Sequence, residues 1–440
     1  MTNAADALLE KIVQRRARVG VIGLGYVGLP VALLFREGGF PVLGFDTDPE
    51  KVAALSAGRS YIRHIGPERV TAAFTGGRAE ATADFDRLGE CDAVLICVPT
   101  PLGPHREPDL SYVRRTADEI ARRLRPGQLV VLESTTYPGT TREELLPRLE
   151  RPGLVAGDDF FLAFSPERED PGNDRFTART VPKVVGGLGA RSLEVAAALY
   201  GSVVERVVPV SSAEVAEASK LLENVFRAVN IALVNELKVV LDRMGIDVWE
   251  VIEAASTKPF GFMPFHPGPG LGGHCLPIDP FYLAWKAAEH GQWARFVELA
   301  GEINARMPQY VVEKTMLGLN AAGKSVKGAR ILVLGLAYKA DVDDDRESPS
   351  FEILETLREL GAEIAYCDPY FPVARKVRRH DLGLASVPCT AQEFARHDAL
   401  IVCTAHRQFR DPALYANAKL VIDARNLLPR APGGPVVVRA

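Results

Sequence analysis

The segment at residues 268–280 places a cysteine among unusually many glycines and prolines. It reads Gly-Pro-Gly-Leu-Gly-Gly-His-Cys-Leu-Pro-Ile-Asp-Pro, so its backbone can pass close to a ligand. A thiol in such a turn predicts a nucleophile at Cys275, and Asp279 could act as a base or orient a water molecule. His274 is adjacent in sequence, which does not bring its ring within reach of the thiol. The alternative is an exposed turn with an inert thiol.

A polar pair stands in an otherwise apolar part of a long helical pattern. Lys220 and Asn224 are four residues apart, so they share one face of the helix. Their neighbours are apolar: Leu221, Leu222, Val225 and Phe226. This pattern predicts that the amine and the amide point inward together. The alternative is a polar stripe on the surface.

A glycine-rich turn follows the first predicted strand, residues 18–22, and reads Gly23-Leu24-Gly25-Tyr26-Val27-Gly28. Between a strand and a helix, the three glycines allow a tight turn, the approach of backbone to a pyrophosphate, and close packing of helix on strand. Asp46 ends the next strand, about 20 residues further on, where a carboxylate accepts hydrogen bonds from ribose hydroxyls and repels a 2′-phosphate. The sequence therefore predicts NAD rather than NADP, and the alternative is a turn that serves packing alone. The expected cofactor contacts are Gly23, Gly25, Tyr26, Val27, Gly28 and Asp46.

Hydroxyl and carboxyl groups follow three further predicted strands, at the edge where ligands bind in an open parallel sheet. Val98-Pro99-Thr100-Pro101 follows one strand, and Glu133-Ser134-Thr135-Thr136 follows the next. We expect Pro99, Thr100 and Thr135 to line the cofactor site; the alternative is that the hydroxyls only cap the following helices. Ser165-Pro166-Glu167-Arg168 follows a third strand. Glu167 is therefore a candidate at the same edge, or else an acid in a solvated loop.

Two cations stand near a second glycine turn, Gly335-Leu336-Ala337-Tyr338-Lys339, which precedes Asp343-Asp344-Asp345-Arg346. Lys339 and Arg346 are predicted phosphate ligands, because arginine offers a bidentate fork and lysine a point charge. The three aspartates do not predict a metal site, since consecutive side chains point in different directions. No other metal-ligand spacing in the sequence is convincing, so no metal is expected.

Alternating strands and helices are predicted to position these residues. Residues 1 to about 205 repeat strand and helix patterns, which predicts a doubly wound parallel sheet. About thirty residues between Ser212 and Gly245 lack Gly and Pro, which predicts one long helix, and further helices are predicted at 249–255 and 280–306. A second α/β region begins near Lys327. The predicted fold is α/β: two Rossmann-like doubly wound domains joined by a long central helix and a helical middle region, with bounds 1–210, 211–315 and 316–440.

Composition limits the partners and the compartment. Lys+Arg 52 against Asp+Glu 56 gives a net charge of -4, so no global positive field attracts nucleic acid or an anionic membrane. No apolar stretch approaches the roughly 18 residues of a membrane span, and the N-terminus lacks the apolar core of a signal peptide. Six cysteines without CxxC spacing predict reduced thiols that serve packing, apart from Cys275, rather than a disulfide framework. We therefore expect a cytoplasmic chain without nucleic-acid or membrane partners.

In this order, the motifs resemble those of the UDP-glucose/GDP-mannose dehydrogenase family over nearly the full length. They are GLGYVGLP, ESTTYPGTT, FSPEREDPG, KLLEN, GGHCLPIDP and GLAYKADVDDDRESPS. The resemblance implies an NAD-binding domain, a long central helix, and a C-terminal Rossmann-like domain that holds the nucleotide sugar. It also implies a homodimer or higher homo-oligomer whose interface lies on the helical region. The implied reaction is a four-electron oxidation of the sugar C6 alcohol to a carboxylate, with two NAD consumed.

The resemblance also assigns roles to the candidate residues. Cys275 would attack the C6 aldehyde to give a thiohemiacetal, and the second hydride would leave a thioester that water hydrolyses. Lys220 and Asn224 would stabilise the developing oxyanion. Asp279, with Thr135 and Glu167, would position or activate the water. The implied substrate contacts are Glu167, Arg168, Lys220, Asn224, Lys258, Gly272, Lys339 and Arg346.

The chain differs from UDP-glucose dehydrogenases at two positions that bear on the choice of substrate. Ile278 stands where UDP-glucose dehydrogenases often have lysine, and His274 stands where they tend to have Ser or Tyr. The form GPGLGGHCLPIDP instead resembles the UDP-N-acetylhexosamine branch. This implies UDP-N-acetylglucosamine as the UDP-sugar substrate and a uronate for surface polysaccharide, with the N-acetylgalactosamine and N-acetylmannosamine epimers as alternatives ahead of UDP-glucose and GDP-mannose. Two alternative functions lie outside the family. A two-electron hydroxyacid dehydrogenase would need no nucleophilic cysteine, and an inactive nucleotide-binding regulator would need no intact set of reactive residues.

Overall fold

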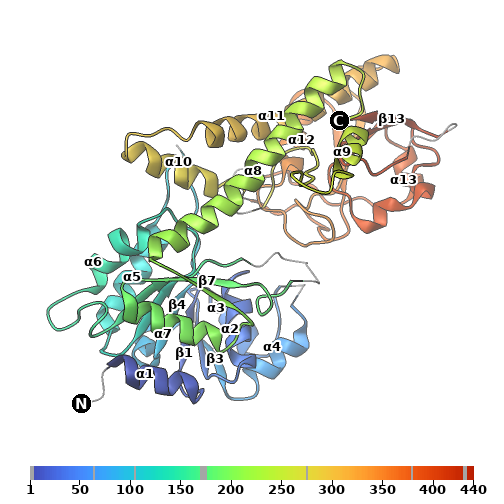
Figure 1. Cartoon of the computed structure of the whole chain (residues 1–440). Coiled ribbons are helices and arrows are strands. Elements are labelled where there is room, and N and C mark those ends of the chain that lie inside the picture. The colour runs from blue at the N-terminus through green and yellow to red at the C-terminus, as the bar shows by residue number, and fades with distance from the viewer. Residues whose placement is uncertain are drawn as a thin grey trace. The chain divides into compact units, whose positions relative to one another are not determined.

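The computed structural model describes residues 4–62, 65–103, 106–168, 176–273, 276–377, 380–429 and 434–440. The chain forms two compact units, of which one comprises Met1–Glu223 and Phe281–Gln292 and the other Asn224–Pro280 and Trp293–Ala440. Each unit has its own sheet (Figure 1). Within the described ranges, no helix is both long and apolar enough to cross a membrane.

The first unit is built on an eight-stranded sheet with the order β3-β2-β1-β4-β5-β6-β7-β8. Segments such as VGVI, AVLI and LVVL are buried at every position because helices cover both faces of the sheet. The order from β3 to β6 is that of dinucleotide-binding sheets, whose switch point lies between β1 and β4. The strands are β1 (Val19–Ile22), β2 (Val42–Phe45), β3 (Ala79–Thr82), β4 (Ala93–Ile96), β5 (Leu129–Leu132), β6 (Phe161–Phe164), β7 (Lys183–Gly187) and β8 (Val207–Val210).

One strand pair departs from the parallel sheet that the sequence predicts. β7 runs antiparallel to β6, with Ala163 opposite Gly187 and Phe164 opposite Gly186. The connection between the two strands contains no helix in its described part, residues 165–168 and 176–182, and a parallel crossover usually needs one. As a result, the amino end of β7 lies at the carboxyl edge of β5 and β6. The apolar residues of a strand do not encode its direction, which is why the sequence did not predict this reversal.

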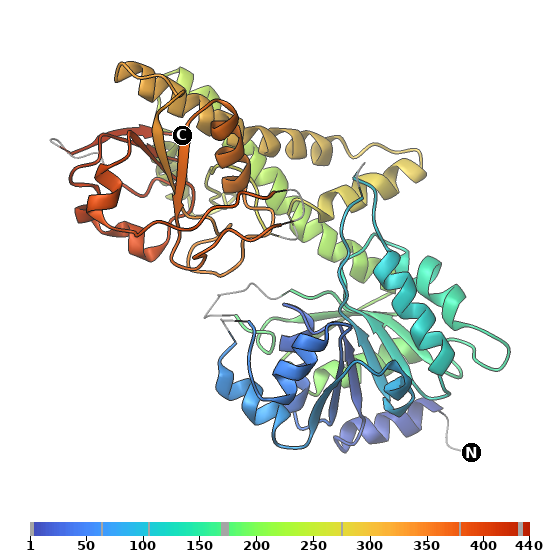
Figure 2. The same ribbon diagram turned by 180° about the vertical axis from the view of Figure 1, so that it is seen from behind.

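Helices cover both faces of the sheet. One face and its helices share a continuous apolar core, formed with α1 (Ala4–Val13), α2 (Gly28–Glu37), α4 (Pro67–Phe74) and α7 (Ala190–Gly201). The opposite face carries α5 (Ser111–Arg123) and α6 (Leu146–Leu149) (Figure 2). The remaining elements of this part are α3 (Pro49–Ser56), the 3-10 helix η1 (Phe85–Glu90) and the π-helical turn η2 (Thr141–Leu145).

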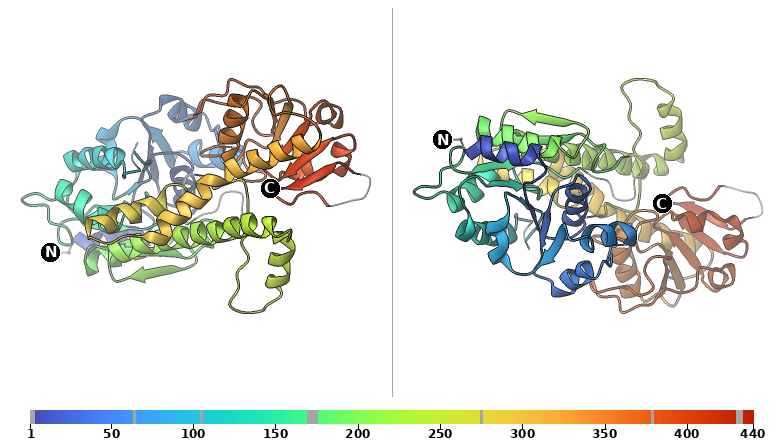
Figure 3. Two further views of the ribbon diagram at one scale, coloured as in Figure 1. Left: turned by 90° about the horizontal axis from the view of Figure 1, so that it is seen from above. Right: turned by 90° about the horizontal axis from the view of Figure 1, so that it is seen from below.

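The predicted long helix is confirmed as α8 (Ala213–Arg243), which has 31 residues. α9 (Val248–Ser256) and the segment after it project from α8 (Figure 3). The single helix predicted over 280–306 is wrong. The structure has α10 (Asp279–Glu289) and α11 (Arg295–Ala321), because Gly291 has a positive φ of 68° and ends the first of them.

The second unit contains a five-stranded parallel sheet with the order β10-β9-β11-β12-β13, another doubly wound arrangement. α11 and α12 (Pro349–Glu359) pack on one face, and α13 (Ala391–Ala395) packs on the other. The strands are β9 (Arg330–Leu334), β10 (Glu363–Cys367), β11 (Ala399–Val402), β12 (Leu420–Asp423) and β13 (Val436–Arg439). The two sheets confirm the predicted α/β class with two Rossmann-like regions.

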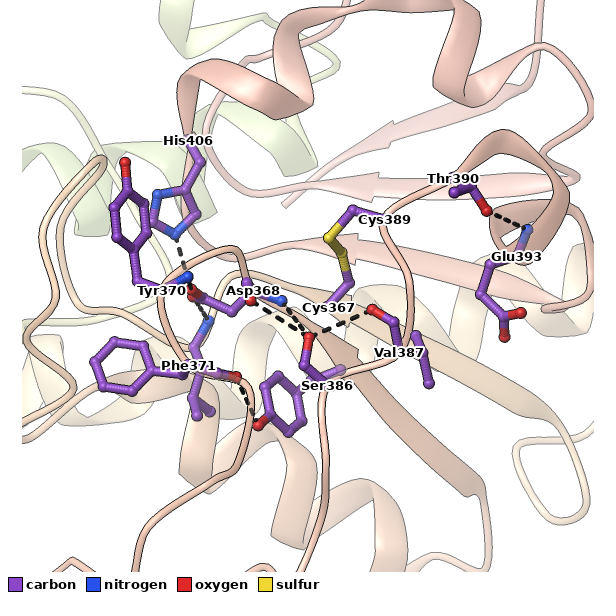
Figure 4. Close-up of a disulfide and its surroundings, with 12 residues drawn as sticks. Cys367, Asp368, Tyr370, Phe371, Ser386, Val387, Cys389, Thr390, Glu393 and His406 are labelled. Carbon is purple, nitrogen blue, oxygen red and sulfur yellow. Dashed lines mark hydrogen bonds and ion pairs between the residues drawn. A yellow bond between two sulfur atoms is a disulfide. The ribbon is translucent and has the colours of Figure 1, made fainter.

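A disulfide joins Cys367 at the end of β10 to Cys389 (Figure 4). The two Cα atoms are 5.7 Å apart although 22 positions separate the residues in sequence. Val387 N donates to Tyr366 O at 2.9 Å, and this contact brings the returning chain alongside the end of β10. The expectation that all thiols are reduced is therefore wrong for this pair. The remaining described cysteines, Cys91, Cys97 and Cys403, are free and buried.

Candidate active site

The first glycine turn has the geometry that its three glycines predict. Gly23 adopts a φ of +91° at the end of β1, and its N–H donates to Phe45 O at 2.8 Å. A Cβ on Gly28 would lie 1.8 Å from Gly23 O, so only glycine lets α2 approach this closely. A Cβ on Gly25 would meet no described atom within 4 Å. The turn is therefore tight and closely packed, with Gly25 open to a ligand.

Asp46 is held firmly at the edge of this turn. Its carboxylate accepts hydrogen bonds from Leu24 N and Asp48 N, both at 2.9 Å, and Lys51 Nζ lies 3.3 Å away. The carboxylate is thus fixed between the glycine turn and α3, where a ribose hydroxyl could reach it. Lys51 was not predicted from the sequence, since a lysine in a first helical turn carries no distinctive signal.

The predicted hydroxyl residues lie after β4 and β5. Thr100 is buried and Thr135 is partly buried. Neither caps a following helix in the described chain: α5 and η2 begin without a side-chain cap. Ser134 instead donates to Val98 O at 2.7 Å, which ties the ends of the two strands together. The adjacent Thr136 has a buried Oγ1 with no hydrogen-bond partner among the residues that the structure describes.

A buried ionic network stands where β5 and β6 end. Lys183 Nζ lies 2.7 Å from Glu133 Oε2 and 3.0 Å from Glu167 Oε2. Tyr200 donates to Glu133 Oε1 at 2.6 Å. Burial raises the pKa of Glu133, more than the neighbouring lysine lowers it. Burial opposes the charge of Lys183, but the two carboxylates outweigh it, so its pKa is above the usual range.

Glu167 is therefore an anchored carboxylate and not a solvated loop acid. Its Oε1 accepts from Arg168 N at 2.8 Å, and its backbone O accepts from Lys220 Nζ at 2.6 Å. Arg168 is also engaged, since it donates to Pro182 O at 2.7 Å and pairs with Glu223 at 2.8 Å. The sequence did not mark Lys183 for a role. Its only signal is a cation at the first position of an otherwise apolar strand.

The predicted polar pair on α8 is buried. Lys220 is 9% exposed and Asn224 is 4% exposed, so the inward orientation is confirmed over the surface stripe. Asn224 Nδ2 donates to Asp279 Oδ2 at 2.6 Å, and Asp279 is buried at the start of α10. An amide and a carboxylate predicted from separate motifs are thus brought into direct contact.

Cys275 and His274 lie outside the described residues, but the glycines before them are described. Gly273 N donates to Arg346 O at 3.0 Å, and a Cβ on Gly272 would lie 2.5 Å from Tyr338 Cβ. The glycine-rich segment therefore packs directly on the loop that follows β9. Only glycine permits this approach.

The second glycine turn repeats the geometry of the first. Gly335 has a φ of +93°, and Leu336 N donates to Asp368 Oδ2 at 2.6 Å, as Leu24 N does to Asp46. In Figure 4, His406 also faces Asp368, with Nε2 3.1 Å from Oδ2. Asp368 and His406 were not predicted, because the two α/β regions show no close repeat in sequence.

The predicted phosphate ligands are placed differently from each other. The Arg346 guanidinium pairs with Asp344, with Nη2 2.7 Å from Oδ2, so a phosphate would have to compete for this fork. Lys339 is partly exposed. Lys258 lies after α9 and is exposed, with Nζ 5.0 Å from the centre of the Phe260 ring. No group of three or more potential metal ligands lies together within the described chain.

Three family models match the chain in sequence order. All describe the UDP-glucose/GDP-mannose dehydrogenase family: the NAD binding domain at residues 17–204, the central domain at 214–306, and the UDP binding domain at 332–430. Among curated relatives, a UDP-N-acetyl-D-glucosamine 6-dehydrogenase from Pseudomonas aeruginosa is 34% identical, with 90% of this chain and 92% of the relative covered. A UDP-N-acetyl-D-mannosamine dehydrogenase from Pyrococcus horikoshii is 36% identical, with coverages of 95% and 97%.

Solved structures agree with this assignment. The structure of a UDP-N-acetylmannosamine dehydrogenase from Pyrococcus horikoshii superposes with a TM-score of 0.85 at 34% identity, over 96% of this chain and 98% of that chain. A UDP-glucose dehydrogenase from Pyrobaculum islandicum gives a TM-score of 0.84 at 29% identity, with coverages of 96% and 97%. The similarity therefore extends over both units.

Proposed function

The chain belongs to the UDP-glucose/GDP-mannose dehydrogenase family, and on this premise we propose that it oxidises the C6 alcohol of a UDP-N-acetylhexosamine to the carboxylate. It is an NAD-dependent oxidoreductase acting on nucleotide sugars. The first-choice substrate is UDP-N-acetylglucosamine, and the N-acetylmannosamine and N-acetylgalactosamine epimers are the alternatives. The relatives named for N-acetylhexosamine substrates support this choice, as does the GPGLGGHCLPIDP segment.

The residues of the first unit fit NAD. Gly25 leaves room for the pyrophosphate, and the first turn of α2 lacks a side-chain cap in the described chain. Asp46 would hold the ribose hydroxyls. Bound NAD supplies the hydride acceptor for both oxidation steps. The remaining proposed contacts are Gly23, Tyr26, Val27, Gly28, Pro99, Thr100 and Thr135.

The observation that carries the covalent mechanism is the buried contact between Asn224 and Asp279, at 2.6 Å. In the proposed reaction, the Cys275 thiolate adds to the C6 aldehyde, and loss of the second hydride converts the thiohemiacetal into a thioester. Water then displaces the thiol and forms the carboxylate. Asn224 donates a hydrogen bond to the oxygen that becomes negative, and Asp279 orients the amide and the water.

Lys220 and Glu167 complete the proposed chemistry. The Lys220 ammonium offers a second donor to the developing oxyanion. Glu167, with Thr135, positions or activates the water that hydrolyses the thioester. Gly272 lets the reactive segment pass close to the sugar, and the proposed contacts to the rest of the substrate are Arg168, Lys258, Lys339 and Arg346.

We also propose three domains, with bounds 1–210, 211–315 and 316–440, and assembly as a homodimer through α8.

The exposed face of α8 is unusually apolar. Leu222 is 68% exposed and Leu233 51%, and Met244, which directly follows the helix, is 64% exposed. The exposed apolar residues follow spacings of three, four and seven: Leu222, Phe226, Leu233, Leu237, Val240 and Met244. We call these six residues the α8 seam. Such a repeat is typical of a helix that pairs with another helix. We propose that the reaction takes place in the cytoplasm.

The experiment that tests this function measures NADH released from limiting nucleotide sugar with excess NAD. The sugars are UDP-N-acetylglucosamine, its two epimers, UDP-glucose and GDP-mannose. We expect two NADH per UDP-N-acetylglucosamine. Two NADH from another sugar would correct the substrate, one NADH per sugar would contradict the four-electron reaction, and no NADH from any of them would contradict the proposed function.

Substitution of the nucleophile tests the covalent step. C275S should abolish uronate formation, because a serine hydroxyl is a weaker nucleophile toward the aldehyde than a thiolate. An ester to serine would also be hydrolysed less readily than the thioester, since an alkoxide is a poorer leaving group than a thiolate. C91S is the matched control, since burial raises the pKa of the Cys91 thiol to about 12 and makes it inert at neutral pH. Uronate production by C275S at the wild-type rate would contradict the mechanism.

A further inference from the structure

Lys183 links two carboxylates at the carboxyl edge of the first sheet. Its Nζ lies 2.7 Å from Glu133 Oε2 and 3.0 Å from Glu167 Oε2. We propose that Lys183 is a positioning residue, which keeps the Glu167 carboxylate ionised and oriented toward the water that hydrolyses the thioester. This inference rests on the proposed function, in which Glu167 acts on that water.

The topology of the sheet places the lysine there. β7 is antiparallel to β6, with Phe164 opposite Gly186. Continuing this register by three residues brings Lys183 opposite Glu167. In a fully parallel sheet, the first residue of β7 would lie at the other edge, far from the ends of β5 and β6. The strand reversal therefore delivers a cation to the edge where ligands bind.

The burial of Lys183 argues against a role in packing alone. Its side chain is 8% exposed and that of Glu133 is 0% exposed. Desolvating such charges is costly, and well-packed apolar residues of similar volume are often at least as stable. A methionine at position 183 could fill the same space. Stabilisation of the fold is therefore a weak explanation for a lysine at this position.

Ionisable groups from several elements face Glu167, and they explain why the cation matters. They are Cys97 after β4, Glu133 after β5, Lys183 on β7 and Lys220 on α8, and Tyr200 on α7 reaches the same network through Glu133. Lys220 binds the backbone oxygen of Glu167, not its carboxylate. Lys183, by contrast, is a cation in direct contact with the Glu167 carboxylate itself.

Removal of Lys183 would leave the carboxylates of Glu133 and Glu167 facing each other. Two like charges in a buried site favour protonation of one of them. Protonated Glu167 could not accept a proton from water. The loss should therefore appear in hydrolysis of the acyl-enzyme and should leave substrate binding largely intact.

The test compares wild type, K183M and K183R as full-length protein. For K183M we expect kcat to fall at least about tenfold, with the Kd for the UDP-sugar changed by less than about threefold. The acidic limb of the pH profile of kcat should move up by about one pH unit. A burst of two NADH per active site should precede a slow steady state. K183R keeps the charge and should restore most of the activity.

K286M is the matched control. Lys286 also contacts two glutamates, with Nζ 2.6 Å from Glu143 and 3.0 Å from Glu289, but lies on α10 away from this network. The pH profile of kcat for K286M should equal that of wild type. If K183M melts as wild type does, keeps the acidic limb of the wild-type pH profile and shows no larger burst of NADH than wild type, the proposal is overturned.

Two further measurements keep the proposal testable in other cases. E133Q removes the competing carboxylate, so its acidic limb should move down, opposite to that of K183M; an unchanged or raised limb overturns the proposal even if K183M does not fold. If wild type oxidises no sugar of the panel, the proposed function fails separately. The protonation of Glu167 is then followed directly by infrared titration of protein that carries isotope-labelled glutamate, and E167Q identifies the Glu167 carboxyl band. Glu167 should protonate at higher pH in K183M than in wild type. Equal titration midpoints in the two proteins overturn the role of Lys183.

Discussion

Glu217 on α8 is completely buried and accepts three hydrogen bonds from the loop that follows β5. Its carboxylate accepts from Gly139 N at 2.6 Å, Thr141 N at 2.8 Å and Thr141 Oγ1 at 2.6 Å. This contact ties the loop that carries Thr135 to the helix that carries Lys220. Burial raises the pKa of Glu217 to about 7, because the three hydrogen bonds only partly offset the loss of water. A single side chain thus links the positions of two proposed catalytic residues.

The raised pKa predicts a pH dependence of stability. In the unfolded chain the carboxyl ionises near its ordinary value of 4.5, and in the folded protein near 7. The folded state therefore binds the proton more tightly, so the free energy of unfolding of the first unit falls as pH rises from about 4.5 to about 7. The contribution is on the order of 3 kcal/mol. E217Q should lose this slope when melting temperature is measured across that range.

The control for this prediction is E214Q, one helical turn earlier. Glu214 pairs with Arg142 at 2.6 Å, and its side chain is 30% exposed. E214Q should keep the wild-type slope. E217Q will also be less stable at every pH, because its amide presents N–H groups to the N–H of Gly139 or Thr141. The informative quantity is therefore the slope, and a wild-type slope in E217Q would refute the assignment.

At the scale of elements, the two glycine turns show how a strand, a turn and a helix share one geometry. Gly23 and Gly335 both have positive φ, and each donates its N–H to the carbonyl at the end of the neighbouring strand, at 2.8 and 2.9 Å. The Asp46 carboxylate lies 3.3 Å from Lys51 Nζ, and the lysine side chain is 35% exposed. Asp368 instead accepts from three backbone N–H groups, those of Leu336, Ala337 and Tyr370, and also faces His406. The same local design thus leaves one carboxylate more accessible than the other.

Two glycines of the first turn provide a matched pair of variants. G28A would place a Cβ 1.8 Å from Gly23 O, so α2 has to move away from β1 and the melting temperature should fall by several degrees. G25A meets no described atom within 4 Å, so the fold should be retained. Because Gly25 is open where the pyrophosphate would lie, G25A should raise the Kd for NAD at least about tenfold, as one lost close contact allows. Calorimetric melting and NAD titration measure both. Wild-type NAD affinity in a stable G25A would contradict the placement of the cofactor.

At the scale of the molecule, α8 buries several polar residues and exposes several large apolar ones. Its buried side carries polar groups such as Glu217, Asn224 and Asn235, whereas its exposed side carries the α8 seam. Apolar surface of this extent is typical of an interface. Asn235 is also paired, since its Nδ2 donates to Asn304 Oδ1 at 2.9 Å, so the polar side is satisfied within the chain. The apolar side is the surface that the proposed homodimer would bury.

The seam predicts a homodimer that one charge can disrupt. L233E places a carboxylate at the middle of the seam, where pairing would bury it without a partner. Light scattering after size exclusion should show twice the mass of one chain for wild type and the mass of one chain for L233E. V155E, at another exposed apolar residue, should remain dimeric. A monomeric wild type, or a dimeric L233E, would contradict this use of α8.

Much of the fold could be predicted because its signals are local. Apolar strands, the absence of Gly and Pro between 213 and 243, and the glycine turns each depend on residues close in sequence. The inward orientation of Lys220 and Asn224 followed from helical spacing and is confirmed. The break between α10 and α11 was missed, since a single Gly291 competes with helical periodicity on both sides.

The sequence by itself determined the α/β class, the family, the cofactor and the segment that holds the proposed nucleophile. Only the tertiary structure decided which distant groups meet: Lys183 with Glu133 and Glu167, and Cys367 with Cys389. The physical reason is that these contacts depend on strand direction and on where the chain returns. A reversed β7 carries its first residue to the opposite edge of the sheet with no change in its apolar pattern, so burial and charge pairing arise from topology and not from local spacing.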